Sequence, residues 1–144
     1  MIAVDTNVLV YAHRREATEH PLAARLLRQL SADLSRWALP WPCLFEFASV
    51  VTNRRIWGER ASTPAQAWDQ IEAWCASPSV VLLSETPEFL DVLGPRVRRA
   101  RIQGPLVHDA RVAALCLAHG VETLLTRDRD FALFPELKTR DPFA

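Results

Sequence analysis

The sequence predicts an α/β domain with a central parallel sheet and helices on both of its faces. Two observations predict this class. Short apolar segments alternate with longer segments whose apolar residues recur at helical spacing. Strands that are separated by helices need crossover connections, which make neighbouring strands parallel and place helices over the sheet. The 144 residues, 49% of them hydrophobic, are enough for one core, and no linker or repeat divides them. We therefore expect one domain over residues 1–144.

The first elements expected along the chain are a strand, a helix and a second strand. The first strand is Ile2–Val4, an apolar segment that is cut off by Asp5. A helix begins at Pro21, because proline suits the first helical position and leucines follow at four-residue spacing. The second strand covers residues 37–39 and is stopped by two nearby prolines.

Two helices and a further strand are expected next. Residues 43–55 form one helix, with large apolar residues on both sides of an acid. Thr63 is followed by proline and, three residues on, by Gln66, which is the pattern of a capped helix start. Val80–Leu83 is a continuous apolar run, typical of a parallel strand that is covered on both faces.

The C-terminal part supplies two more helices and a last strand. Thr86 and Pro87 are expected to cap one helix, and Asp109 is expected to open the next, which Gly120 ends. The strand Thr123–Leu125 follows. Two aspartates and a short apolar turn at residues 131–134 come after it.

Composition excludes several classes of protein. The 17 basic and 17 acidic residues cancel, whereas a nucleic-acid-binding protein usually has a basic excess. The three cysteines contain no C-x-x-C pair, so we expect reduced thiols in a reducing compartment and neither a disulfide framework nor a zinc site. The N-terminus has no basic segment typical of a signal peptide, and no apolar run is long enough to span a membrane. We expect a cytoplasmic protein.

Acidic side chains stand where an open parallel sheet collects ligand-binding residues, beyond the carboxyl ends of its strands. Asp5 ends the first strand, although strands disfavour aspartate. Glu46 lies among bulky apolar residues, where burying an unpaired acid is costly. Asp109 alone could be a helix cap, and Asp128 and Asp130 alone could be turn residues.

Taken together, these acids predict a divalent-cation site. Carboxylates that lie close together raise one another's pKa, and a hard cation removes this repulsion. Mg²⁺ and Mn²⁺ prefer such oxygen ligands, and they can activate a water that attacks a phosphodiester. A nucleic-acid substrate could then bring its own neutralising cation, which weakens the objection that the net charge is zero.

Three segments resemble the PIN-domain ribonucleases, in particular the VapC-type toxins of bacterial toxin–antitoxin modules. They are VDTNVLVYA at 4–12, WPCLFEFASVVTN at 41–53 and GPLVHDARVAALCLAHGVETLLTRDRDF at 104–131. The segments occur in the family's order, and residues 63–107 match only in their helix–strand–helix outline. The resemblance implies an α/β/α sandwich and a metal-dependent endoribonuclease that uses Mg²⁺ or Mn²⁺. It also implies a homodimer and a cognate VapB-type antitoxin as partner.

The resemblance further implies roles for individual residues. Asp5, Glu46 and Asp109 match the acidic triad of the family, and Asp128 matches its fourth acid. Asp130 lies close enough to share or take that fourth role. Two more residues, Asn7 and Thr126, match polar residues that hold the acids and waters in place.

Several alternatives accompany this interpretation. A haloacid-dehalogenase-type phosphatase also begins with a strand and an aspartate, but it needs a second aspartate where Asn7 stands and a lysine that only Lys138 could supply. A PIN domain that has lost activity could serve as an RNA- or protein-binding module. The five tryptophans could stack on bases, although more of them are expected in the core or a dimer interface.

Three arginines near the predicted acids are a separate hypothesis. We expect Arg129 to pair with surface acids, whereas Arg111 or Arg127 would contact RNA phosphate. His108 precedes Asp109, but a water activated by metal makes a histidine base unnecessary.

Overall fold

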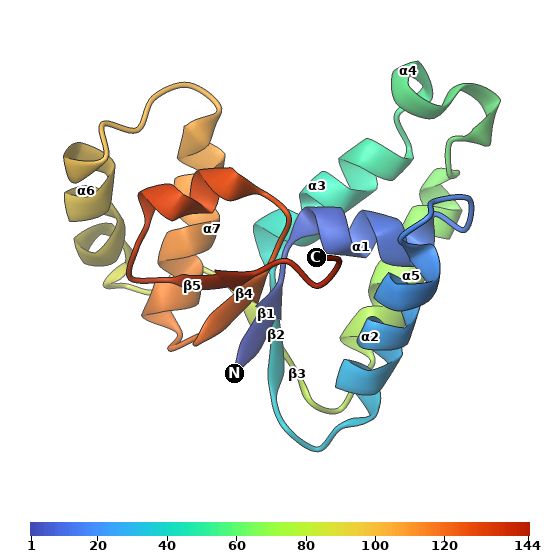
Figure 1. Cartoon of the computed structure of the whole chain (residues 1–144), viewed down its shortest axis with the longest axis horizontal. Helices are drawn as coiled ribbons and strands as arrows, with labels where there is room; N and C mark the ends of the chain where they lie inside the picture. Colours follow the sequence, from blue (N-terminus) through green and yellow to red (C-terminus); the bar gives the residue numbers. More distant parts are fainter.

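Five parallel strands form the centre of the structure, a computed structural model that describes residues 1–144 throughout (Figure 1). The strands lie in the order β3-β2-β1-β4-β5, so the N-terminal strand is central. Along the chain the elements are β1 (Ile2–Val4), α1 (Thr6–His13), α2 (His20–Ala32), β2 (Trp37–Pro40), α3 (Trp41–Val51), α4 (Arg54–Trp57), the 3₁₀ turn η1 (Gly58–Arg60), α5 (Pro64–Cys75), β3 (Val80–Leu83), α6 (Phe89–Arg99), α7 (Leu106–Ala118), β4 (Thr123–Leu125), the 3₁₀ turn η2 (Arg129–Leu133) and β5 (Lys138–Arg140).

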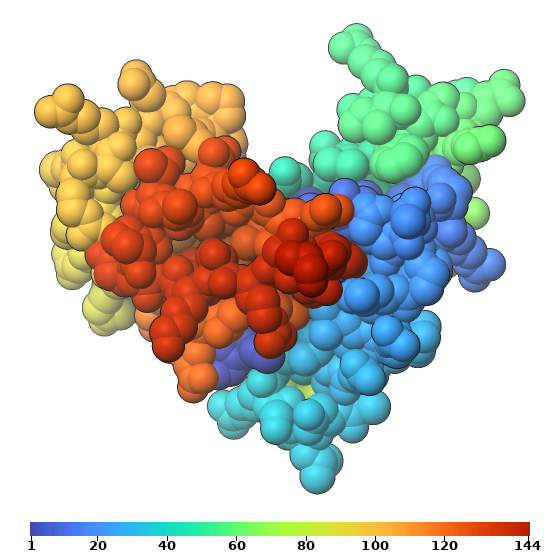
Figure 2. Space-filling model, viewed as in Figure 1, coloured from blue at the N-terminus to red at the C-terminus, as the bar shows by residue number.

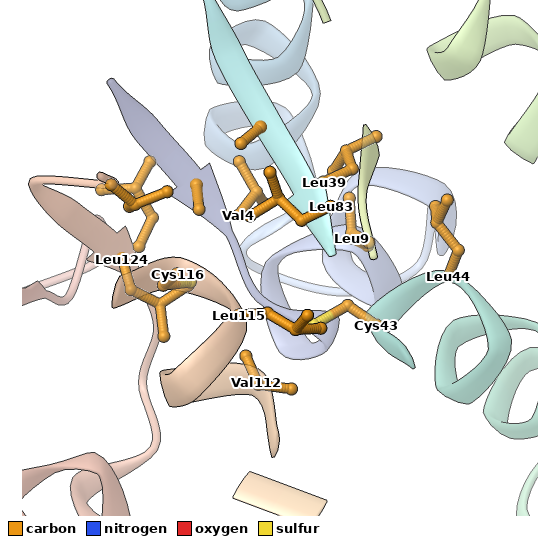
Figure 3. Close-up of a cluster of buried hydrophobic side chains, with 14 of the residues drawn as sticks. Val4, Leu9, Leu39, Cys43, Leu44, Leu83, Val112, Leu115, Cys116 and Leu124 are labelled. Atoms are coloured by element: carbon orange, nitrogen blue, oxygen red, sulfur yellow. The ribbon is translucent and has the colours of Figure 1, made fainter. Parts of the chain in front are cut away.

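Helices lie on both sides of this sheet, as the element order predicts. Figure 1 shows α6 and α7 on one side of the strands and α1, α2, α3 and α5 on the other. Apolar side chains from both layers meet at the strands, and Val4, Leu39 and Leu124 lie with Leu115 and Cys116 of α7 in one fully buried cluster (Figure 3). None of the helices combines the length and the apolar character needed to cross a membrane.

The parallel register brings the carboxyl ends of the strands to one edge of the sheet. Ile2 of β1 lies opposite Trp37 of β2 and Thr123 of β4. The backbone N–H of Asp5 donates to the carbonyl oxygen of Leu125 at 3.0 Å, so the ladder continues one residue beyond β1. Residues that follow β1 and β4 are therefore neighbours, although about 120 positions separate them in sequence.

Helix α1, strand β5 and the short turn η1 were not expected from the sequence. Helix α1 begins directly after Asp5, and its residues Val8 and Val10 are β-branched, so its apolar run resembles a continued strand. Strand β5 has three exposed side chains and no apolar pattern, because it lies at the edge of the sheet beside β4. Only pairing with β4 reveals it as a strand.

Several helix boundaries differ from the expected ones. The helix expected at residues 43–55 begins at Trp41 and ends at Val51, after which Asn53 caps the separate helix α4. The helix expected to be capped by Thr86 and Pro87 begins at Phe89, because those residues form a turn closed by the Phe89 N–H and the Thr86 carbonyl at 3.0 Å.

Asp109 was wrongly expected to open its helix. Helix α7 begins three residues earlier, at Leu106, so Asp109 lies in the first turn. Strand β3 was also expected to be covered on both faces, but it is an edge strand, and only Leu83 is fully buried in it. An edge strand has one neighbour, which leaves its first three residues partly exposed.

Candidate active site

All four of the main predicted acids line one pocket of about 400 Å³. The pocket lies at the carboxyl edge of the sheet, between α1, α3 and Trp57 of α4 on one side and α7 with the residues after β4 on the other. Figure 2 shows a notch between these two halves of the molecule. The lining residues are Asp5, Thr6, Asn7, Val10, Tyr11, Glu46, Val50, Trp57, Asp109 and Asp128.

Asp5 forms the floor of this pocket and is only 6% exposed. Its Oδ2 accepts hydrogen bonds from Thr126 Oγ1 at 2.7 Å and Asn7 Nδ2 at 3.1 Å, and its Oδ1 accepts from Cys43 Sγ at 3.5 Å. Burial raises the pKa of this carboxyl, and the Thr126 hydrogen bond acts against the increase. These hydrogen bonds hold the carboxylate in one orientation, and its burial makes the charged form less favourable.

Thr126 and Asn7 form a polar bridge between the ends of β1 and β4. Besides donating to Asp5, the Thr126 hydroxyl accepts from Asn7 Nδ2 at 3.1 Å and from the Asp128 N–H at 2.9 Å. Asn7 Oδ1 accepts from the Arg127 N–H at 3.2 Å. Asn7 and Thr126 therefore contact the acids that the resemblance assigned them to support, and their role in function stays a prediction.

Asp109 shows how strongly the acids interact. Its pKa is raised from 3.8 to about 6, first by burial and then by the charges of four other acids, which are Asp128, Asp5, Asp130 and Glu46 in that order of effect. Carboxylate oxygens of Asp109, Asp128 and Asp130 all lie within 4.8 Å of one another. The folded chain therefore concentrates negative charge that nothing in the protein neutralises.

Glu46 lines the pocket from an exposed position and not from the buried one that its apolar neighbours in sequence suggested. It was expected to be an acid buried among apolar residues, but its position on α3 is exposed, as is that of Phe45. Helical periodicity turns Cys43 and Phe47 inward instead. Glu46 Oε2 accepts from Thr6 Oγ1 at 3.0 Å, so Thr6 positions this carboxylate. Sequence reasoning missed Thr6, although it stands between Asp5 and Asn7.

The geometry favours Asp128 over Asp130 as the fourth acid. Asp128 is half-buried and lines the pocket, whereas Asp130 is exposed and does not. Asp128 Oδ1 also accepts the Asp130 N–H at 2.8 Å, so the Asp128 side chain caps η2. The close approach of the Asp130 carboxylate still makes it a possible ligand, and the choice stays a prediction.

The expectation that Arg129 pairs with surface acids is wrong, and the two arginines proposed for RNA form such pairs instead. Arg111 pairs with Glu85 at 2.5 Å. Arg127 pairs with Glu19 at 3.1 Å and with Asp141 at 3.5 Å, while Arg129 forms no ion pair. The two arginines proposed for RNA are thus held by carboxylates, because acids distant in the sequence lie beside them.

Two other expectations concern His108 and the cysteines. His108 is exposed and does not line the pocket, and all three cysteines are free thiols.

The structure is therefore that of an α/β/α protein with a carboxylate pocket at the carboxyl edge of its parallel sheet, and comparison with known families shows which family it belongs to. A family model described as "PIN domain" matches residues 2–137. The chain therefore belongs to the PIN-domain family. The phosphatase alternative is thereby excluded.

Within this family the chain is similar to VapC ribonucleases. It is 37% identical over 142 residues to ribonuclease VapC43 of Mycobacterium tuberculosis, covering 99% of this chain and 95% of that protein. VapBC2 of Rickettsia felis, solved bound to a DNA fragment from its promoter, superimposes with a TM-score of 0.70 over 97% of this chain and 98% of that one. VapC20 of Mycobacterium tuberculosis, described as a sarcin–ricin loop cleaving toxin, gives 0.65 over 92% and 93%. Both structures are 18% identical to this chain and share its fold.

Proposed function

We propose that this protein is a metal-dependent endoribonuclease, the toxin component of a toxin–antitoxin module, which hydrolyses RNA phosphodiester bonds. One observation carries the proposal: Asp5, Glu46, Asp109 and Asp128, spread over 124 positions of sequence, line a single pocket. The full-length similarity to proteins named as ribonucleases supports the same reaction.

The residues of the pocket fit Mg²⁺ or Mn²⁺. All the charged donors are carboxylates, which are the ligands that these hard cations prefer. The pKa of Asp109 is raised to about 6 by burial and by neighbouring acids, and a cation would relieve both effects. Asp5, Asp109 and Asp128 would hold it, with Glu46 as a further ligand and with Asp130, whose carboxylate lies close to those of Asp109 and Asp128, as the alternative to Asp128. When bound, the cation supplies Lewis acidity toward the scissile phosphate and the attacking water.

The other residues of the site would keep the carboxylates in place during the reaction. Thr126 and Asn7 hold Asp5, and Thr6 holds Glu46, so these two carboxylates cannot rotate freely. Such preorganisation means that little reorganisation is needed when charge develops on the phosphate. The apolar wall of Val10, Val50 and Trp57 limits water on the opposite side of the pocket.

Asp5→Asn tests the mechanism. The asparagine keeps the size of the side chain and removes its charge, so we expect a folded protein that no longer cleaves RNA in the presence of Mg²⁺ or Mn²⁺. Asp91→Asn is the matched control, because it removes an exposed acid in the first turn of α6 that does not line the pocket. Cleavage by Asp5→Asn at the wild-type rate, or by the wild type in excess chelator, would contradict the mechanism.

The same experiment decides between an enzyme and a catalytically silent binding module. Wild-type protein that binds RNA but never cleaves it, with either metal, would favour the binding module. Several solved structures of this fold are toxin–antitoxin complexes, which supports a VapB-type antitoxin as partner of this chain. A homodimer and a cytoplasmic location remain part of the proposal, and sedimentation velocity would test the former.

A further inference from the structure

A second depression, of about 1000 Å³, lies beside the carboxylate pocket and has the opposite character. It is formed by the C-terminal end of α1, the residues after it, the segment after η1 and one face of α5. Nine of its ten lining residues are polar or charged, and three of them are arginines: Arg14, Arg15 and Arg60. We call this depression the arginine groove.

Trp57 and Arg14 form the boundary between the two depressions. The guanidinium of Arg14 lies 4.0 Å from the centre of the Trp57 ring, and Trp57 itself lines the carboxylate pocket. Trp57 is held in place because its Nε1 donates to the Val50 carbonyl at 2.8 Å. The arginine groove and the carboxylate pocket are therefore adjacent and are separated by this contact.

Two arginines that form no ion pair supply the charge of the groove, and Glu16 offsets part of the charge of Arg60. Arg14 is buried, pairs with Glu16 and donates to the Arg60 carbonyl at 2.8 Å, so it serves the structure of the groove wall. Arg15 and Arg60 are exposed and form no ion pair. Asp69 is the remaining acid of the lining, which leaves the groove with a net positive charge.

Neutral hydrogen-bonding groups line the rest of the groove. His13 bridges Gln70, at 3.1 Å from Nδ1, and Ser62, at 2.8 Å from Nε2. Burial lowers the pKa of His13, so this bridge is uncharged at neutral pH. Amides and hydroxyls of this kind suit ribose 2′-hydroxyls and exposed base edges.

We propose that the arginine groove binds the RNA strand on one side of the scissile bond, with Arg15 and Arg60 contacting backbone phosphates. The inference rests on the proposed function. RNA is favoured over an acidic protein segment because the groove adjoins, across the contact of Arg14 with Trp57, the pocket that would hold the scissile phosphate. The pocket itself contributes only carboxylates as charged groups, so flanking phosphates need cations elsewhere.

The test measures RNA binding in the Asp5→Asn protein, so that cleavage does not interfere. The double variant Arg15→Ala and Arg60→Ala removes both free charges and keeps the Arg60 carbonyl that Arg14 needs. The matched control is Arg25→Ala with Arg28→Ala, which removes two exposed, unpaired arginines from α2. The probe is a labelled single-stranded RNA of about 20 nucleotides, long enough to cover both depressions.

Counterion release sets the expected effect. Each lost phosphate contact on a single strand lowers the slope of log K against log salt by about 0.7, so two contacts lower it by about 1.4. The affinity then falls roughly 25-fold at about 0.1 M salt, and the difference disappears toward 1 M. The control pair should change both quantities by much less. An RNA of about 4 nucleotides, confined to the carboxylate pocket, should not distinguish the variants.

Unchanged affinity and salt slope in the groove variant, with its thermal unfolding intact, would overturn the proposal. So would an equal loss in the control pair, which would indicate a diffuse charge effect. Loss of binding to a cognate antitoxin with RNA binding retained would make the groove a protein site instead. Because binding is measured without cleavage, these outcomes are distinct from failure of the nuclease mechanism.

Discussion

The cluster of carboxylates should make the metal-free protein less stable than it could be, and Asp109→Asn measures that cost. Asp109 has its pKa raised from 3.8 to about 6, first by burial and then by the charges of four other acids. An ionised group whose pKa is raised by folding destabilises the folded state. Asparagine has a similar shape and no charge, so in excess chelator the variant should be more stable than the wild type.

The size of the effect follows from the pKa. A rise from 3.8 to about 6 corresponds to about 3 kcal/mol of unfolding free energy for a fully shielded group. Asp109 is only half-buried, and solvent screening reduces this to about 1–1.5 kcal/mol. Below the unfolded pKa, Asp109 is protonated in both states and the two proteins should be equally stable. The difference should grow between about pH 4 and pH 6 and stay constant above pH 6.

The assay is urea unfolding across this pH range in chelator. Asp91→Asn is the matched control, because Asp91 also lies in the first turn of a helix but is exposed and remote from the acids. A carboxylate there is stabilised by the helix dipole, so its loss should cost about 0.3–1 kcal/mol. Adding Mg²⁺ should reverse the order: at about 100 times its Kd the cation stabilises the wild type by about 2.7 kcal/mol. If Asp109→Asn lowers stability in chelator as Asp91→Asn does, the repulsion argument is refuted.

Two further predictions concern residues around the acids. Thr126→Val should lower the unfolding free energy by about 1–3 kcal/mol, because the buried Asp5 carboxylate loses its donor at 2.7 Å. Thr126→Ser keeps the hydroxyl and should retain most of the wild-type stability. Equal stability of the two variants in urea would contradict this prediction. Arg127→Ala should lower the unfolding free energy by no more than about 1 kcal/mol. It should leave RNA affinity and its salt dependence unchanged, because the guanidinium is already paired with Glu19 and Asp141. A weaker salt dependence in a binding titration would show a phosphate contact instead.

The sequence by itself determined the architecture and the acids. Apolar strands alternating with helices required a parallel sheet, and its carboxyl edge had to collect the side chains that end the strands. Local signals were sufficient where they act within a few residues. The capping box at Thr63 and Gln66 formed as its pattern predicts, because both of its hydrogen bonds are local.

Only the tertiary structure decided which side chains those acids meet. Thr126, which donates to Asp5, and Thr6, which donates to Glu46, are distant from these acids in sequence, as is Glu19 from Arg127. The exposure of Glu46 depended on which face of α3 packs inward, and strand β5 depended on pairing with β4. Such contacts arise from packing between distant segments, and no short window of sequence records them. The pocket and its positively charged neighbouring groove are therefore products of the fold.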